Sequence, residues 1–207
     1  SCLTNLLEAF ENWTTALDEG FGLDIIYLDF SKAFDTVPHK RLCKKLRQLG
    51  IGGKLLEWIT DFLSGRYSRV GVRGEFCSWM EVLSGVPQGS VLGPLFFLTY
   101  VNDLPDWMKC QIRLFADDTK LWKGIATKED SLELQLDLDN LMRWSMIWQL
   151  KFNATKCKVM HVGHTLETSY FLRVDDIKRQ LAETTEERDL GVIVTNDLKP
   201  AGQCVKA

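Results

Sequence analysis

The 207-residue sequence lacks the patterns that mark structural zinc sites, disulfide frameworks and membrane-spanning segments. Its six cysteines are scattered, without a C-x-x-C pair or a histidine at ligand spacing, which favours reduced thiols. No signal peptide is evident, and the longest apolar run, VLGPLFFLTYV, is too short to cross a bilayer and contains a proline. We therefore expect neither structural zinc nor disulfides, no membrane association, and a location inside the cell, in the nucleus or the cytoplasm.

Histidine is also scarce, with three residues in the chain. His161 and His164 have a spacing seen in zinc sites, but no paired cysteines precede them, so we interpret them as residues at the end of a strand. The abundant residues are those of a folded domain. Hydrophobic side chains make up 45% of the chain, and seven tryptophans and eleven phenylalanines argue against disorder. The length suits one domain or two small ones.

The net charge gives no overall indication of a nucleic-acid partner, because 25 basic and 28 acidic residues leave a balance of −3. The distribution of charge is less even. No acidic residue occurs between Thr36 and Leu56, whereas six basic residues do: Lys40, Arg41, Lys44, Lys45, Arg47 and Lys54. Such a segment permits a polyanionic partner, and the simpler alternative is a solvated helix face.

Hydrophobic periodicity predicts an α+β fold, in which an antiparallel sheet carries helices on one face. Helices are expected at 1–20, 38–50, 54–65, 95–102 and 128–148. Strands are expected at 23–30, 156–162, 170–174 and 189–194, with hairpins at 66–82 and 112–122. In the first helix the apolar residues at helical spacing are Leu3, Leu6, Leu7, Phe10, Trp13 and Leu17. In the last helix we expect Leu132, Leu136, Leu141 and Trp144 to face inward.

Two adjacent aspartates, Asp117 and Asp118, interrupt an apolar hairpin in the stretch RLFADDTKLW. Aspartate favours turns, so a plain turn is one explanation of the pair. The other is that the turn carries ligands for a hard cation. Asp29 ends an apolar strand, where an unpaired carboxylate would be costly. If that strand lies beside the hairpin, three carboxylates meet, and two divalent cations, Mg²⁺ or alternatively Mn²⁺, would neutralise them. A site of this kind serves phosphoryl transfer in general, so a nuclease remains open.

Five segments follow one another along the chain: YLDFSKAFDTVPH, GVPQGSVLGPLFFLTYVNDL, LFADDTKLW, NATKCKVMHVG and RDLGVIV. In order and spacing they resemble the successive polymerase motifs of reverse transcriptases, most nearly those of non-LTR retrotransposons of the jockey-like and chicken-repeat type. The likeness covers essentially the whole chain. It implies a polymerase palm with part of the fingers. It also implies synthesis of DNA on an RNA template, from deoxynucleoside triphosphates and a DNA primer.

The resemblance implies a role for individual residues. Asp29, Asp117 and Asp118 match the catalytic, metal-binding aspartates, and the backbone carbonyl of Phe30 matches a further metal ligand. Phe34, five residues after Asp29, matches an aromatic ring that excludes the ribose 2′-hydroxyl. The other matches are Gly85, Gln88 and Gly89 beside the template–nucleotide pair, Lys156 near the leaving pyrophosphate, and Leu190 and Gly191 in the hairpin that supports the primer.

The resemblance also implies that parts of the family's polymerase, further fingers residues and a helical thumb, are missing from this chain. We expect a partial reverse transcriptase domain, with fingers and palm elements at 1–85, the palm core and catalytic hairpin at 86–163, and primer-supporting strands at 164–207. Alone, these residues are expected to extend a primer little or not at all. Two alternatives stay open. One is an inactive remnant that binds nucleic acid or protein. The other is a different two-metal phosphotransferase, such as a nuclease or an RNA-templated RNA polymerase.

Overall fold

The computed structural model describes residues 1–163, 166–174 and 177–206, so His164 lies outside the described residues. The chain forms two compact units. The sheet unit comprises residues 1–30, 104–146 and 152–207, and the helical unit comprises residues 31–103 and 147–151. The expected subdivision at residues 85 and 163 follows the order of the motifs and stays a prediction.

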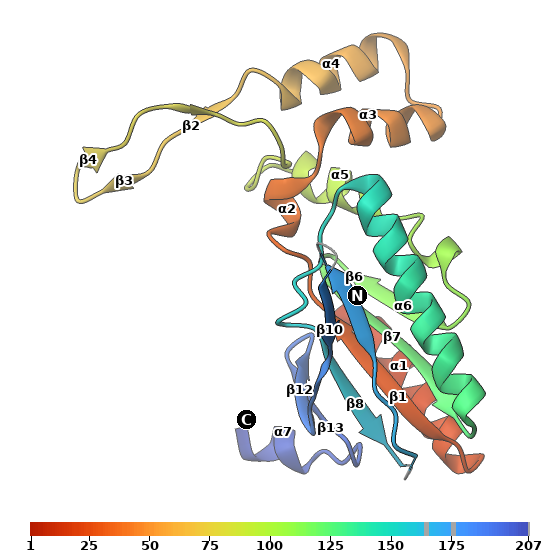
Figure 1. Ribbon diagram of the computed structural model, residues 1–207. Helices are drawn as coiled ribbons and strands as arrows, with labels where there is room; N and C mark the ends of the chain where they lie inside the picture. The colour runs from red at the N-terminus through yellow and green to blue at the C-terminus, as the bar shows by residue number, and fades with distance from the viewer. Residues whose placement is uncertain (164–165, 175–176, 207) are drawn as a thin grey trace. The chain divides into compact units, whose positions relative to one another are not determined.

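A five-stranded sheet forms the centre of the sheet unit (Figure 1). The elements of this unit are α1 (Cys2–Asp18), β1 (Gly22–Leu28), η1 (Pro105–Trp107), β6 (Gln111–Phe115), β7 (Asp118–Ile125), α6 (Lys128–Trp148), β8 (Lys158–Val162), β9 (Phe171–Val174), β10 (Ile177–Gln180), β11 (Ala182–Glu183), β12 (Glu186–Asp189), β13 (Val192–Thr195) and α7 (Ala201–Lys206). The spatial order of the sheet is β11-β8-β1-β7-β6. All neighbours are antiparallel except β11, which pairs parallel with β8. The predicted antiparallel sheet is therefore confirmed, with one short parallel strand added.

Helix α1 covers one face of this sheet. Its first residue follows Ser1, whose side chain accepts a hydrogen bond from the backbone of Thr4 and so caps the helix. From α1, Ala9 and Trp13 enter an apolar cluster whose other buried members are Leu23, Ile25, Trp122, Met160, Val162 and Val194. The rings of Trp13 and Trp122 meet edge to face, with centroids 5.7 Å apart. Since Leu23 and Ile25 alternate along β1, they define the face on which α1 packs.

The opposite face of β1 is buried as well and carries a charged residue. Asp24 is 0% exposed. Its carboxylate accepts hydrogen bonds from Thr168 and Tyr170 and lies 2.5 Å from Nδ1 of His161. The hydrogen bond to Asp24 raises the pKa of His161, the residue before the last of β8. These bonds compensate for the removal of the carboxylate from water.

The predicted inward face of α6 is partly wrong, and the apolar residues at helical spacing in α1 are not all buried. In α1, Leu3 and Leu7 are exposed, whereas Leu6 and Trp13 are buried. In α6, Leu132 and Leu136 are exposed, and the buried stripe consists of Leu134, Leu138, Leu141 and Trp144. The segment LELQLDL carries leucine at every second position, so two overlapping stripes satisfy helical spacing. The packing of the sheet unit selects the second of them.

The C-terminal region also differs from the prediction. The strand expected at 189–194 is a hairpin, β12–β13, in which Asp189 pairs with Val192 around a turn of Leu190 and Gly191. Both turn residues have positive φ, 49° and 92°, which suits a two-residue hairpin turn. Strands β10 and β11 and helix α7 were not predicted, because their short polar segments carry little periodicity.

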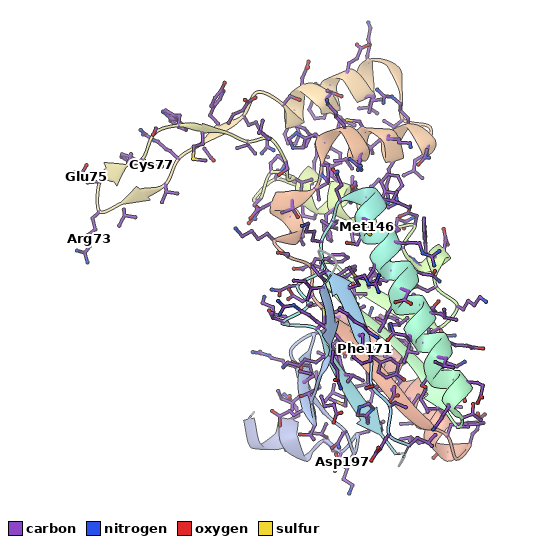
Figure 2. The ribbon with its side chains drawn as sticks, viewed as in Figure 1. Arg73, Glu75, Cys77, Met146, Phe171 and Asp197 are labelled. Atoms are coloured by element: carbon purple, nitrogen blue, oxygen red, sulfur yellow. The ribbon has the colours of Figure 1, made fainter. Side chains whose placement is uncertain are left out.

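The helical unit contains three helices of ten or eleven residues and a long hairpin. Its elements are α2 (Ala33–Thr36), α3 (His39–Gln48), α4 (Gly53–Leu63), β2 (Tyr67–Ser68), β3 (Gly71–Val72), β4 (Glu75–Phe76), β5 (Met80–Glu81) and α5 (Leu92–Val101). The hairpin turns at Arg73 and Gly74, as predicted, with φ of 52° and 91°. Figure 2 marks Arg73, Glu75 and Cys77 near the end of this hairpin.

The basic segment of the helical unit divides into structural and exposed residues. Lys45 is buried, forms an ion pair with Asp103, and donates to the carbonyl of Tyr100. Arg41 donates to the backbone of Ile147 and the side chain of Gln149. The other four basic residues, Lys40, Lys44, Arg47 and Lys54, are exposed. Two of the six basic residues therefore serve the fold of their unit, and four remain on its surface.

No helix among the described residues has both the length and the apolar character needed to cross a membrane. The six cysteines are free thiols, of which Cys43 and Cys157 are buried. Burial raises the pKa of the Cys157 thiol to about 11. This thiol is therefore protonated near neutral pH.

Candidate active site

The register of two central strands brings Asp29 level with Asp118. Strand β1 pairs antiparallel with β7, and its last residue, Leu28, lies opposite Thr119. One further step along each chain places Asp29 opposite Asp118, the first residue of β7. Neighbouring strands in a sheet lie about 4.7–4.9 Å apart. The two strands are thus neighbours, as predicted. Asp29 and Asp118 lie at the same end of this strand pair.

The turn between β6 and β7 is formed by Ala116 and Asp117, because Phe115 is paired with Asp118. Ala116 has a φ of 52°, in the left-handed region that non-glycine residues seldom adopt. Asp117 therefore occupies the tip of the hairpin, and Asp118 begins the returning strand. The first explanation of the aspartate pair, a hairpin turn, is correct as far as the backbone is concerned.

Several carboxylates act on Asp118. Its side chain keeps contact with solvent, yet the surrounding protein raises its pKa above the ordinary value. The first cause is partial loss of water, followed by the negative charges of Asp117, Asp189 and Asp29, which the charge of Lys120 partly offsets. The surroundings of Asp118 thus disfavour its ionised form, although its side chain is exposed. This indicates a place where positive charge is accommodated.

Lys156 supplies positive charge to Asp29. Its Nζ lies 3.3 Å from Oδ2 of Asp29, and both side chains are substantially exposed. The turn before Lys156 is held by Asn153, whose side chain accepts hydrogen bonds from the backbone and hydroxyl of Thr155. The backbone N–H of Asn153 donates to the carbonyl of Asp29 at 2.8 Å. Lys156 is therefore fixed to the segment that carries Asp29.

A cavity of about 350 Å³ opens over these residues. Its lining includes Asp29, Asp118, Lys156 and Leu190, so the 186–195 hairpin forms one of its walls. The other lining residues are Asn5, Tyr27, Leu28, Arg113, Phe115, Thr119, Lys120, Thr155, Lys158, Glu187, Arg188 and Asp189. The cavity is thus bounded by three of the catalytic candidates, Asp29, Asp118 and Lys156, and by the hairpin predicted to support a primer, whereas Asp117 is not part of its lining.

The carboxylate oxygens in this cavity are ligands of the type that hard divalent cations bind. Aspartate oxygens are preferred ligands of Mg²⁺, and a cation would relieve the repulsion that raises the pKa of Asp118. Among the described residues, however, no three His, Cys, Asp or Glu side chains are grouped so that they could hold a metal ion. The oxygen atoms and the negative charge suit a divalent cation, but Asp29, Asp117 and Asp118 do not form a three-ligand cluster in this arrangement.

The other candidates divide between the two units. In the sheet unit, Phe30 stacks on Phe152 with ring centroids 4.3 Å apart. In the helical unit, Phe34 packs against Phe97 at 4.6 Å, and Gln88 donates a 2.7 Å hydrogen bond to Asp35. The roles of these residues toward a metal, a sugar or a template stay predictions.

The GVPQG segment is anchored within the helical unit. Gly85 donates to the carbonyl of Val37, and its own carbonyl is bonded by His39 and Arg66. A Cβ at position 85 would lie 2.6 Å from the Asp35 carbonyl oxygen, so glycine is required for this close approach. Gly89 has a similar φ, 82°, but open space around it.

Sequence reasoning missed six charged residues of the cavity, Arg113 and Arg188 and a group of four: Lys120, Lys158, Glu187 and Asp189. The last four form two ion pairs, Lys120 with Asp189 at 2.5 Å and Lys158 with Glu187 at 2.8 Å. The alternation of β7 could have placed Lys120 on the same side as Asp118. Its partner could not have been found, because 69 residues separate the two.

Comparison with known proteins shows the family of the chain. The family model described as reverse transcriptase (RNA-dependent DNA polymerase) matches residues 23–194. The RNA-directed DNA polymerase from mobile element jockey of Drosophila melanogaster is 34% identical over 164 residues, which are 73% of this chain and 17% of that protein. The jockey polymerase of Drosophila funebris is 30% identical and covers 83% of this chain. The chain thus spans less than a fifth of the length of these relatives, 17% and 19%.

Solved structures show the same fold. Apo telomerase from Candida tropicalis, truncated from its C-terminal domain, superposes with a TM-score of 0.62 over 95% of this chain and 40% of its own, at 11% identity. Telomerase from Candida albicans, in complex with a fragment of telomeric RNA, superposes with a TM-score of 0.54 over 91% of this chain and 35% of its own, at 15% identity. The predicted α+β polymerase palm is confirmed by these likenesses, and the family match shows that the chain belongs to the reverse transcriptases.

Proposed function

We propose that this chain carries the nucleotidyl-transfer site of an RNA-directed DNA polymerase of a non-LTR retrotransposon. The observation that supports the proposal best is the pairing of β1 with β7, which places Asp29 and Asp118 level with each other in one cavity. The reaction is in-line attack of a primer 3′-hydroxyl on the α-phosphate of a deoxynucleoside triphosphate, with pyrophosphate leaving.

The carboxylates would provide the negative charge that holds cations beside the reacting phosphates. Asp29, Asp117 and Asp118, with the carbonyl of Phe30, would hold two divalent cations, Mg²⁺ or Mn²⁺. When bound, such ions lower the pKa of the attacking hydroxyl and stabilise charge on the phosphate oxygens. Lys156 brings a positive charge beside Asp29, where it would interact with the leaving pyrophosphate.

Residues of the helical unit are assigned to substrate selection. The ring of Phe34 would occupy the space of a ribose 2′-hydroxyl and so favour deoxynucleotides. Gln88 and Gly89 would contact the template–nucleotide pair. The turn of Leu190 and Gly191, in the sheet unit, would support the primer strand. RNA template, DNA primer and deoxynucleoside triphosphate are the proposed partners.

Single-nucleotide incorporation tests the proposal. The chain, in large excess over a labelled DNA primer on an RNA template, is given Mg²⁺ and one deoxynucleoside triphosphate. A single addition in excess protein requires less hold on the duplex than long extension, so weak binding does not hide it. We expect slow addition of one nucleotide, reduced at least about 100-fold in Asp118→Asn, because a ligand of the cations that would stabilise the transition-state charge is weakened.

The matched control is Asp197→Asn, an exposed aspartate outside the cavity, marked in Figure 2. This variant should keep the rate of the original chain. Measurable addition at equal rates in Asp118→Asn and the original chain would contradict the proposal. Shortening of the primer in place of its elongation would favour the nuclease alternative.

A further inference from the structure

A row of side chains crosses the central sheet beneath the primer-supporting hairpin. In the register of the sheet, Tyr27 of β1 lies opposite Lys120 of β7 on one side and Lys158 of β8 on the other. Residues directly opposite each other in a ladder point to the same face. Two lysines therefore flank a tyrosine on the face that also lines the cavity.

Strand β12 presents two carboxylates to this row. Glu187 and Asp189 are two residues apart, so their side chains leave the strand on the same side. Asp189 pairs with Lys120 at 2.5 Å, and Glu187 pairs with Lys158 at 2.8 Å. Tyr27 lies between the two lysines in the register of the sheet. Burial and the charges of Asp189 and Glu187 raise its pKa well above the ordinary value, so it stays neutral. We refer to the four charged residues, Lys120, Asp189, Lys158 and Glu187, as the ion-pair row.

The two pairs of the row differ in burial. The side chains of Lys120 and Asp189 are 5% and 6% exposed, whereas those of Lys158 and Glu187 are 38% and 22% exposed. An exposed pair contributes little, because water screens both charges. A buried pair behaves differently: removing one partner leaves an uncompensated charge away from water, which strongly disfavours the arrangement. Lys120 and Asp189 should therefore be far more sensitive to substitution.

The buried pair is adjacent to two functional elements. Asp189 directly precedes the turn of Leu190 and Gly191, and Lys120 is two residues from Asp118 on the same side of β7. In the described strands β12 pairs with β13 and not with the five-stranded sheet. Side-chain contacts hold this hairpin against the sheet: the ion-pair row, and Val194 of β13, which lies in the apolar cluster.

We propose that Lys120 and Asp189 are positioning residues that fix the Leu190–Gly191 turn beside the catalytic carboxylates and thereby seat the primer end. The inference rests on the proposed function for the role of the turn, and on the geometry alone for its attachment. Lys120 and Asp189 do not act on the reacting atoms. They determine whether the wall of the cavity that contacts the primer is in place.

Hydrogen exchange of the 207-residue chain tests the attachment. We compare Lys120→Met with Lys158→Met, its matched control in the same row. Amides of the paired strand residues 187–189 and 192–194 should exchange more than about tenfold faster in Lys120→Met, because the buried charge of Asp189 loses its partner. They should change less than about threefold in Lys158→Met. If Lys120→Met yields little folded protein, Asp189→Asn is the milder substitution and should act in the same direction. Unchanged exchange of these strand amides in the folded variant would overturn the inference.

A second measurement tests the role toward the primer. Affinity is measured by fluorescence anisotropy for a recessed primer–template and for a blunt duplex of the same length. The original chain should prefer the recessed end, Lys158→Met should keep that preference, and Lys120→Met should lower the ratio of affinities toward one. A preference that Lys120→Met keeps would overturn the inference alone. Absence of any preference in the original chain would overturn the proposed function and the primer role with it.

Discussion

Replacement of Gly85 in the helical unit should be damaging for two reasons visible in the backbone, its conformation and a close contact. Its φ is +87°, and a Cβ would lie 2.6 Å from the carbonyl oxygen of Asp35. The left-handed conformation costs an alanine about 1–2 kcal/mol. The close approach adds a second cost, because ordinary contacts begin near 3.4 Å and the obstructing atom is backbone.

The obstructing segment cannot move freely. The hydrogen bonds from Gly85 to Val37 and from His39 and Arg66 to Gly85 hold the two segments together. Forcing extra volume into a packed site costs about 1–3 kcal/mol. Gly85→Ala should therefore lower the free energy of unfolding by about 2–5 kcal/mol in total.

Gly89→Ala provides the matched control. Its φ of +82° is similar, but no atom lies within 4 Å of the position that a Cβ would take, so only the conformational cost of about 1–2 kcal/mol applies. The assay is urea denaturation of both variants, followed by tryptophan fluorescence. Equal losses of unfolding free energy would refute the reasoning, because they would show that the backbone of Asp35 moves aside without a cost in free energy.

Two further predictions concern the active site. Phe34→Ala should raise the ratio of ribonucleotide to deoxynucleotide incorporation at least about tenfold in the single-nucleotide assay, because the ring would no longer fill the 2′ space. The loss of stability from its contact with Phe97 must be measured alongside. An unchanged ratio would mean that the ring of Phe34 only packs against Phe97. Asp118→Asn should raise the melting temperature of the metal-free chain at pH 7, because the folded protein raises the pKa of this carboxyl and so disfavours its charge. The original chain gains stability as the pH falls through the raised pKa toward the ordinary value. The difference in melting temperature between Asp118→Asn and the original chain should therefore shrink in acid. A difference that is constant with pH would show that the charge of Asp118 is not its cause.

Local patterns predicted most of the elements that carry the site. An apolar run ending in Asp29 predicted β1, and the apolar flanks of Asp117 and Asp118 predicted the β6–β7 hairpin. The glycine turn at Arg73 and Gly74 was predicted for a similar reason, since a positive φ favours that residue type. These features depend on residues that are close together in the chain.

Features that depend on distant residues could not be predicted. Leu132 and Leu134 are equally apolar, and only the packed neighbours of α6 determine that the second is buried. The pairing of Lys120 with Asp189 needs the placement of β12 over the sheet, which no periodicity encodes. Charged residues in strands are usually assigned to the surface, so the burial of Lys120 and Asp189 was unexpected.

The central position of β1 has a consequence for synthesis of the protein on the ribosome. Ile25 pairs with Trp122 on one side and with Met160 on the other, so both neighbours of the strand are made long after it. Pairings so distant in sequence form slowly, and until they form the nascent chain exposes an apolar strand with two open edges. The amino-terminal part of the chain should therefore depend on chaperones during translation until β8 has left the ribosome.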